Sequence, residues 1–199
     1  MIVLDTGRTC AARIGDETRL DVSMDAALLL AALAGRAGDR VDLVAHDRRT
    51  RVQLSAGSGA ALLPDLVDAL APLEPELTET DYRGMVSVVL SRVRKRALVV
   101  LLAALDRPAM EEGLLPALPA LTARHTVIVA AVRAPDPELD RTDVDAAYHH
   151  AATGRAALDR AAVTARMARM GVVVVDADPE SLAPRLADAY LDLKAAGRL

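Results

Sequence analysis

The chain has 199 residues, a net charge of −4 and an apolar content of 52%, with three Tyr but no Phe or Trp. A chain of this length can bury a sizeable core, and that core must be aliphatic. The acidic balance and the scarcity of aromatic rings argue against nucleic acid as a partner, because phosphates need a basic surface and bases need rings to stack on.

Cysteine usage and hydropathy indicate a cytoplasmic protein. The single cysteine, Cys10, cannot form an internal disulfide, which suits a reducing compartment. The longest apolar runs, 26–34 and 97–105, are well short of the ~20 residues that cross a bilayer, and the N-terminus lacks a signal-peptide pattern. We therefore expect no membrane segment in this chain.

Short apolar runs alternate with helical periodicity along the chain, which is typical of a layered α/β fold. The predicted strands are 2–4, 41–45, 50–54, 97–105, 126–132 and 172–175. Unbroken apolar runs suit parallel strands that are covered on both faces. The run 50–54 follows its predecessor too closely for a crossover helix, so we expect it to form an antiparallel hairpin at the sheet edge.

Apolar residues at helical spacing predict helices over 22–33, 62–70, 85–93 and 182–193. Thr18 with Asp21 resembles a capping box, and Thr80-Asp81 offers an N-cap for the helix over 85–93. The segment 114–121 also has helical spacing, but Pro116 and Pro119 are expected to divide it into two short pieces.

Three further segments have plain structural interpretations. The stretch 134–145 holds two prolines and five acidic residues, so we expect an exposed loop; it lacks the ligand spacing and central glycine of a calcium loop. The basic run 92–96 is expected to complement a helix C-terminus. Gly57-Ser58-Gly59 lacks the pattern of a phosphate loop and is expected to start a helix.

In an open parallel sheet, ligands collect beyond the carboxyl ends of the strands, where the winding reverses. The segments 5–9, 76–81 and 103–106 are expected at that edge. The loop Asp5-Thr-Gly-Arg-Thr9 resembles the metal-ion-dependent adhesion motif of von Willebrand factor A domains, which reads Asp-x-Ser-x-Ser.

A closer resemblance, over nearly the whole chain, is to the C-terminal, von Willebrand factor A-like domain of the bacterial family named domain of unknown function 58. It is carried by the loop 5–9 and by GDRVDL at 38–43, LVVLLAAL at 98–105, RHTVIVA at 124–130 and ADAYLDLK at 187–194. The resemblance implies one doubly wound α/β domain over 1–199, with a mostly parallel sheet and one antiparallel edge strand.

When the motif is carried over residue by residue, the resemblance implies that Asp5 is the motif aspartate. Gly7 then replaces the first serine, and Thr9 keeps a hydroxyl at the position of the second serine. It makes Thr80 the threonine of the later loop. Ala104 stands where the family commonly has Asp, so it brings no oxygen to a cation that wants six.

The implied metal site is therefore degenerate. Asp5, Thr9 and Thr80 would be its remaining ligands, binding Mg²⁺ or Mn²⁺ weakly or no cation at all. Asp81 and Asp106 are the carboxylates available to replace the missing one, although a cap and a turn are the plainer roles for them.

No catalytic apparatus is evident. Cys10 has no base tied to it by sequence and is expected to be a small buried hydrophobe. His46 at a strand end, His125 at a strand start and the His149-His150 pair in a loop lack the spacing of a zinc site.

The leading hypothesis is a non-catalytic protein-binding module whose partner-binding rim comprises Asp5, Gly7, Arg8, Thr9, Thr80, Asp81 and Asp106. The resemblance implies a MoxR-type AAA+ ATPase as partner, in protein assembly or maturation. The alternative is a cation-dependent module that captures an acidic partner residue. Full-length family members usually carry two membrane helices and a further domain before this segment, which allows for a longer, membrane-tethered parent protein.

Overall fold

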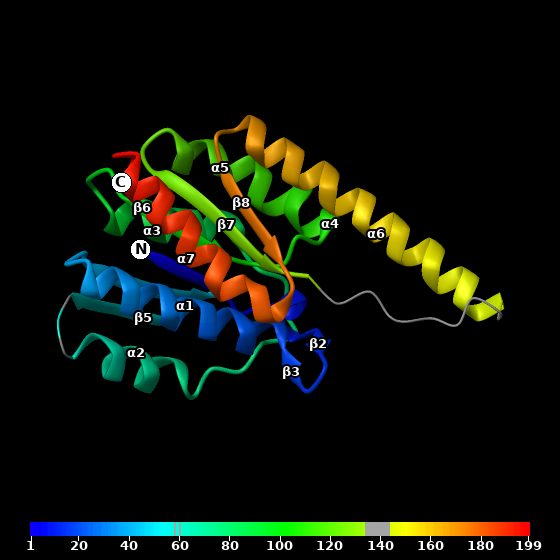
Figure 1. Ribbon diagram of the computed structural model, residues 1–199, viewed down its shortest axis with the longest axis horizontal. Coiled ribbons are helices and arrows are strands. Elements are labelled where there is room, and N and C mark those ends of the chain that lie inside the picture. The colour runs from blue at the N-terminus through cyan, green and yellow to red at the C-terminus, as the bar shows by residue number, and fades with distance from the viewer. Residues whose placement is uncertain (58, 60, 134–143) are drawn as a thin grey trace.

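A six-stranded sheet in the order β5-β4-β1-β6-β7-β8 forms the centre of the computed structural model, which describes residues 1–57, 59, 61–133 and 144–199 (Figure 1). Its strands are β1 (Ile2–Asp5), β4 (Val41–His46), β5 (Thr50–Gly57), β6 (Leu98–Leu102), β7 (Thr126–Val132) and β8 (Val173–Ala177). Neighbouring strands are parallel except for β4 and β5, which form the predicted antiparallel edge hairpin. The predicted fold class is confirmed.

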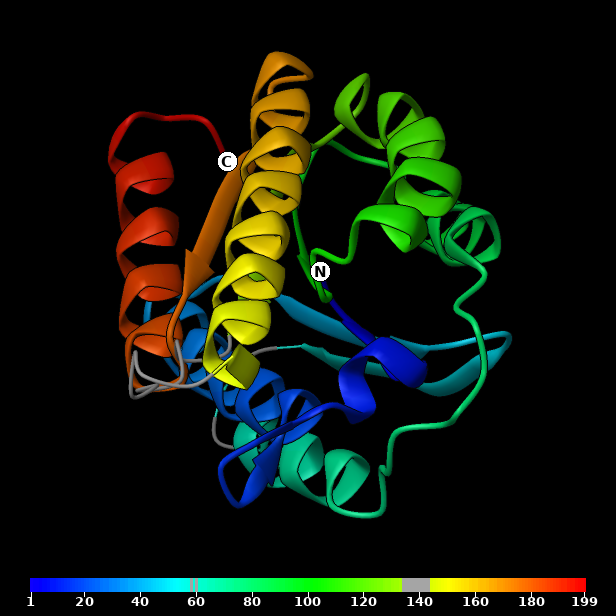
Figure 2. The same ribbon diagram turned by 90° about the vertical axis from the view of Figure 1, so that its right-hand side faces the viewer.

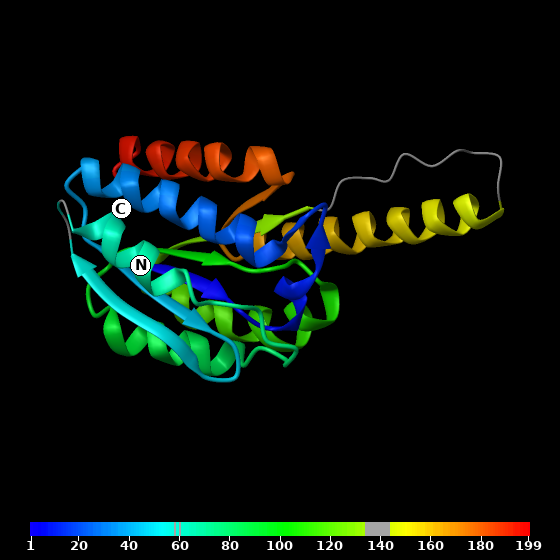
Figure 3. The ribbon, with the colours of Figure 1, turned by 90° about the horizontal axis from the view of Figure 1, so that it is seen from below.

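Helices cover both faces of the sheet, giving three layers (Figure 3). One face carries α1 (Arg19–Arg36), α2 (Leu62–Leu70) and α7 (Pro179–Ala195). The other carries α3 (Tyr82–Arg92), α4 (Arg107–Ala109), a π-helical turn η2 (Met110–Leu114), α5 (Leu115–Thr122) and α6 (Val144–Arg169). A 3₁₀ turn η1 (Arg8–Ala11) and a small hairpin of β2 (Arg13–Ile14) and β3 (Glu17–Thr18), which the sequence patterns did not indicate, connect β1 to α1.

The core is aliphatic, as composition requires. In the central strand β1, Ile2 and Leu4 pack beneath α1 and α7, while Val3 packs beneath the opposite layer, and all three are buried. Burying one such side chain contributes roughly 1.5–3 kcal/mol to folding. This explains why β1 is an unbroken apolar run.

The two prolines near residue 116 do not divide the helical segment in the predicted way. Pro116 lies in the first turn of α5, where its missing N–H has no helical acceptor to lose, and Pro119 lies inside the helix. The irregularity precedes both prolines, in the π-helical turn η2. The prediction of a break at the prolines was wrong, because α5 runs through Pro119 with the loss of one backbone hydrogen bond.

Helix α6 also differs from expectation. Val144 and Asp145, predicted to end a loop, begin this helix, and the pair at 149 and 150 lies within it rather than in a loop; the rest of the predicted loop, 134–143, lies outside the described residues. The helix projects past the body of the molecule (Figures 1 and 3). Over 152–169, where burial is described, only Val163 and Met167 are buried, so this part of the helix has no long apolar stripe.

Other expected boundaries moved by a few residues. β6 ends at Leu102, short of residue 105, and α2 begins at Leu62 rather than at Gly57-Ser58-Gly59, of which Ser58 is outside the described residues. The capping box of Thr18 and Asp21 is present, and α3 ends at Arg92, where the basic run begins. None of the described helices is long and apolar enough to span a bilayer.

The winding of the sheet reverses at β1, which pairs with β4 on one side and with β6 on the other. The loops that follow β1 and β6 therefore share the carboxyl edge of the sheet, onto which Figure 2 looks. This edge is where the predicted site residues should meet.

Candidate functional site at the carboxyl edge

Asp5 ends β1, and its carboxylate is enclosed by hydrogen-bond donors of the protein. Asp5 is only 1% exposed to solvent. Oδ1 accepts from the Gly7 amide at 2.8 Å and from Thr80 Oγ1 at 2.6 Å, and Oδ2 accepts from the Tyr82 hydroxyl at 2.7 Å. Both carboxylate oxygens are therefore engaged within the chain.

Two glycines make this arrangement possible. A Cβ at position 7 would meet Thr80 Oγ1 and would lie 3.0 Å from the Thr78 carbonyl oxygen, so only glycine lets Thr80 reach Asp5. A Cβ at Gly113 in η2 would lie 2.5 Å from the Tyr82 ring. The Gly7 that departs from the adhesion motif is thus the residue that admits the threonine hydroxyl.

Backbone contacts hold the loop 76–81 against the turn after β1. The Glu76 amide donates to the Thr6 carbonyl at 2.8 Å, and the Arg8 amide donates to the Thr78 carbonyl at 2.9 Å. The Thr6 hydroxyl donates to Asp47 Oδ2 at 3.1 Å, which fixes the β4–β5 turn to the same loop. The expected juxtaposition of segments 5–9 and 76–81 is confirmed.

The remaining predicted residues have partners of their own. Asp81 is the N-cap of α3 and accepts from the Gly84 amide at 2.9 Å, so the cap belongs to Asp81 and not to Thr80. Arg8 is exposed and forms an ion pair with Glu79 at 2.7 Å. Asp106, which precedes α4, is paired with an arginine.

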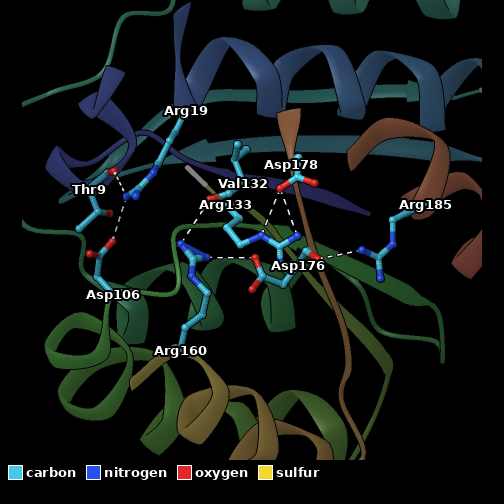
Figure 4. A network of polar contacts seen from close by, with 9 residues as sticks. All are labelled: Thr9, Arg19, Asp106, Val132, Arg133, Arg160, Asp176, Asp178 and Arg185. Carbon is cyan, nitrogen blue, oxygen red and sulfur yellow. Dashed lines mark hydrogen bonds and ion pairs between the residues drawn. The ribbon is translucent and has the colours of Figure 1, made fainter. Parts of the chain in front are cut away.

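That arginine is Arg19, the first residue of α1, which no sequence pattern had singled out. Its Nη1 donates to the Thr9 carbonyl and to Asp106 Oδ2, both at 3.2 Å (Figure 4). The Arg19 guanidinium therefore lies between Thr9, at the second serine position of the motif, and Asp106, the candidate replacement carboxylate.

Burial dominates the electrostatics of this edge. It raises the pKa of the Asp5 carboxyl, an effect that hydrogen bonds from Thr80, Gly7 and Tyr82 oppose and that the charge of Asp47 reinforces. Burial, with the nearby Asp5, raises the pKa of the Tyr82 hydroxyl and that of the Cys10 thiol well above their usual ranges. The thiol is accordingly a poor nucleophile, as expected of a small buried residue.

His46 and His125 lie at opposite edges of the sheet. His46 ends β4 at this edge as predicted, is buried, and has a pKa lowered by burial. His125 precedes β7 at the opposite edge, and neither ring nitrogen has a hydrogen-bond partner among the described residues. Within that part of the chain, no group of three or more His, Cys, Asp or Glu side chains is placed to hold a metal ion.

The residues of the adhesion motif do not fit a divalent cation in this arrangement. Asp5 has given its oxygens to three protein donors, Ala104 is 2% exposed and has no oxygen to offer, and Asp106 is paired with Arg19. The hollow beside Thr9, Thr80 and Tyr82 has a volume of about 10 Å³, roughly that of one water molecule. A cation that needs six oxygens would have to displace these contacts.

Sequence reasoning missed two residues that decide this geometry, Tyr82 and Arg19. Tyr82 gave no signal apart from lying two residues after Thr80, and Arg19 gave none apart from following the predicted cap Thr18. Both act through side chains that reach from a helix start to a segment distant in the sequence or on another element, which no local pattern encodes.

Solved structures with the same fold include conserved hypothetical protein BatB from Bacteroides thetaiotaomicron, at 15% identity and a TM-score of 0.59, over 97% of each chain. The VWA domain of SpRpn10 matches at 12% identity and a TM-score of 0.55, over 94% of this chain and 92% of that one. An aerotolerance-related membrane protein from Bacteroides fragilis matches at 13% identity and a TM-score of 0.54, over 94% of this chain and 97% of that one.

These identities show a von Willebrand factor A-like fold and nothing finer. A comparison with curated proteins found no match. The model of the family described as "Protein of unknown function DUF58" matches residues 1–145. With its von Willebrand factor A-like sheet and its Asp5 loop at the carboxyl edge, this chain belongs to the DUF58 family.

Proposed function

We propose that the chain is a non-catalytic protein-binding module. It binds its partner through the partner-binding rim at the carboxyl edge of the sheet, without a divalent cation. The observation that carries this proposal is the buried Asp5 carboxylate, both of whose oxygens accept hydrogen bonds from protein donors. A bridging cation or a substrate proton would have to displace these hydrogen bonds to reach the carboxylate oxygens.

The other reactive side chains near this edge support a non-catalytic role. Cys10 is buried with a raised pKa, and His46 is buried as well. Nucleophilic catalysis needs a nucleophile with a base in hydrogen-bond reach and access to substrate. A buried thiol at this edge does not meet the last condition.

Exposed side chains around Asp5 supply a contact surface. Leu77 is 81% exposed on the loop 76–81, whose backbone is bonded to Thr6 and Arg8. Arg8 and Glu79 flank it in an exposed ion pair. An apolar anchor with a charged border on a fixed loop is typical of a protein-binding patch.

For the partner we propose a MoxR-type AAA+ ATPase, with a role in protein assembly or maturation. This part of the proposal comes from the family resemblance; the exposed rim is compatible with it. The test is biolayer interferometry between the chain and the MoxR-type ATPase of the same cell, with Mg²⁺ or with EDTA. We expect binding in both buffers.

Leu77→Ser provides the surface test, with Leu158→Ser as its matched control because Leu158 is 70% exposed on α6. We expect Leu77→Ser to weaken the complex about tenfold, equivalent to about 1.4 kcal/mol, and Leu158→Ser to leave it unchanged. Absence of any complex with the unmodified chain would overturn the ATPase assignment.

Titration calorimetry with Mg²⁺ and Mn²⁺ tests the cation independence. We expect no binding heat for the unmodified chain and none for Asp5→Ala. A heat that is present in the unmodified chain and lost in Asp5→Ala would restore the cation-dependent alternative.

A further inference from the structure

Four arginines from separate elements line the carboxyl edge around the ends of β1, β6, β7 and β8 (Figure 4). We call them the arginine rim: Arg19 at the start of α1, Arg133 after β7, Arg160 in α6 and Arg185 in α7. They are far apart in the sequence, so only the fold brings them to one edge.

The inner part of the rim is fixed. Arg160 Nη1 donates to Asp176 Oδ1 at 3.1 Å, with side chains only 16% and 19% exposed, and its Nη2 lies 3.5 Å from the Val132 carbonyl. Arg19 is held by Thr9 and Asp106 as described above. These two guanidinium groups are therefore placed before any partner arrives.

The outer part of the rim is loosely engaged. Arg133 directs both Nε and Nη2 to one oxygen of Asp178, at 3.2 and 3.1 Å, and both side chains are half-exposed. Arg185 is exposed and donates to the Asp176 carbonyl at 3.1 Å. An exposed pair of this kind contributes little to stability, so a partner carboxylate can replace it at small cost.

Within the part of the chain that the structure describes, three of the four guanidinium groups are paired with carboxylates, and Arg185 is not. Among the described residues drawn at this edge, the four guanidinium groups face three carboxylates, those of Asp106, Asp176 and Asp178 (Figure 4). The planar fork of arginine matches a carboxylate better than any other side chain does. An exposed guanidinium that donates to a carbonyl, beside an exchangeable arginine–carboxylate pair, favours an acidic partner segment.

We propose that the arginine rim binds an acidic segment of the partner protein. Arg133 and Arg185 make the exchangeable contacts with its carboxylates. Arg19 and Arg160 keep their positions and contribute positive charge. This inference rests on the proposed protein-binding function and names the chemistry of its partner. The four groups come from four elements, which suits several carboxylates along an extended peptide better than one small anion.

The probe is a fluorescein-labelled octaglutamate peptide, followed by fluorescence anisotropy with the whole chain at low and at physiological salt. We expect binding that weakens with salt and that octalysine does not reproduce. The double variant Arg133→Ser/Arg185→Ser should weaken it at least tenfold. Both side chains are exposed or half-exposed, and unchanged circular dichroism should show that the fold persists.

The matched control is Arg36→Ser/Arg169→Ser, which removes the same charge from two exposed arginines at the ends of α1 and α6. We expect this control to bind octaglutamate like the unmodified chain. Equal weakening by both double variants, no binding at all, or full competition by millimolar inorganic phosphate would each overturn the rim as a peptide site.

The complex with the ATPase separates the two proposals. A complex that Arg133→Ser/Arg185→Ser weakens supports the rim as its acidic-segment site. If the complex forms with unchanged affinity in that variant, the rim inference is wrong while the protein-binding function stands. If no complex forms with the unmodified chain, the proposed function itself fails.

Discussion

Asp5 occupies the position at which an adhesion-type domain would hold a cation, yet its neighbours are hydroxyl and amide donors. Thr80 and Tyr82 lie 75 and 77 residues later in the chain and still reach its two oxygens. A carboxylate bonded in this way ties the start of α3 to the end of β1. At the scale of the residue, Asp5 is therefore a structural connection.

Substitution of Asp5 should reveal this role. Asp5→Ala leaves the hydroxyls of Thr80 and Tyr82 and the Gly7 amide without their partner, and each buried unsatisfied group costs about 1–3 kcal/mol. We expect urea unfolding to show a loss of about 3 kcal/mol or more. Asp5→Asn keeps one acceptor oxygen and should lose about 1 kcal/mol. Equal losses in the two variants would contradict the assignment.

The pH dependence of stability should carry the same signature. Burial raises the pKa of the Asp5 carboxyl above its ordinary value of 3.8, so the folded state binds this proton more tightly than the unfolded state does. The contribution of Asp5 to the unfolding free energy is therefore greatest below pH 3.8 and is lost as pH rises through the folded-state pKa.

Asn at position 5 has no such proton, and the titrating groups that do not interact with Asp5 cancel in a comparison of the two proteins. We expect the unfolding free energy of the unmodified chain, relative to Asp5→Asn, to fall as pH is raised from about 3.5 to 7. A difference that does not change with pH would show that Asp5 titrates alike in both states.

At the scale of the element, helix starts and short turns bring the side chains of the edge together. The Thr18–Asp21 capping box begins α1 and thereby directs Arg19 toward Thr9 and Asp106. The Asp81 N-cap begins α3 and places Tyr82 over Asp5. The caps thus position both residues that the sequence patterns missed.

Thr18→Ala should destabilise the chain by about 1 kcal/mol, since it removes an N-cap hydroxyl that accepts from the Asp21 amide. Thr18→Ser keeps the hydroxyl and is the control. Urea unfolding of both variants measures the effect. If Thr18→Ser loses as much as Thr18→Ala, the methyl group and not the cap is the important part.

Gly7→Ser restores the side chain of the adhesion motif but should not restore a cation site. Its Cβ would meet Thr80 Oγ1 and displace the donor of Asp5, so we expect a loss of about 2 kcal/mol by thermal unfolding, within the range for overpacked positions. Gly154→Ser is the control, because a Cβ there has open space. A stable Gly7→Ser variant that binds Mg²⁺ would show that the loop rearranges readily.

At the scale of the whole molecule, two helical layers cover an aliphatic sheet, and Cys10, in the turn η1 at the carboxyl edge, is 1% exposed. Its reaction with a thiol reagent should therefore report opening of the fold. Burial raises the thiol pKa well above its usual range, which slows the reaction further.

We expect no labelling of Cys10 by a disulfide reagent under native conditions and complete labelling in urea. Leu158→Cys, at an exposed position of α6, should react at once and serves as the positive control after the Cys10 signal is subtracted. Rapid native labelling of Cys10 would mean that the carboxyl edge opens locally, without global unfolding.

The amino-acid sequence by itself predicted the six strands of the main sheet, the helices near 22–33, 62–70, 85–93 and 182–193, the antiparallel edge strand and the Thr18 cap. Each of these features depends on residues within a few positions of one another, where periodicity and turn chemistry act. The sequence also placed segments 5–9 and 76–81 at one edge, because the carboxyl ends of parallel strands meet there. It did not indicate the β2–β3 hairpin or the helix α6.

Only the tertiary structure decided what Asp5 bonds to, which carboxylates Arg19 and Arg133 face, and how α6 projects from the sheet. The same sequence pattern, an aspartate at the end of the first strand, is compatible with a carboxylate that accepts a hydrogen bond from Tyr82 and with one that binds a cation. The choice depends on side chains that are more than seventy residues away and on a glycine that leaves room for one hydroxyl. Such choices are settled by packing, which acts through space and not along the chain.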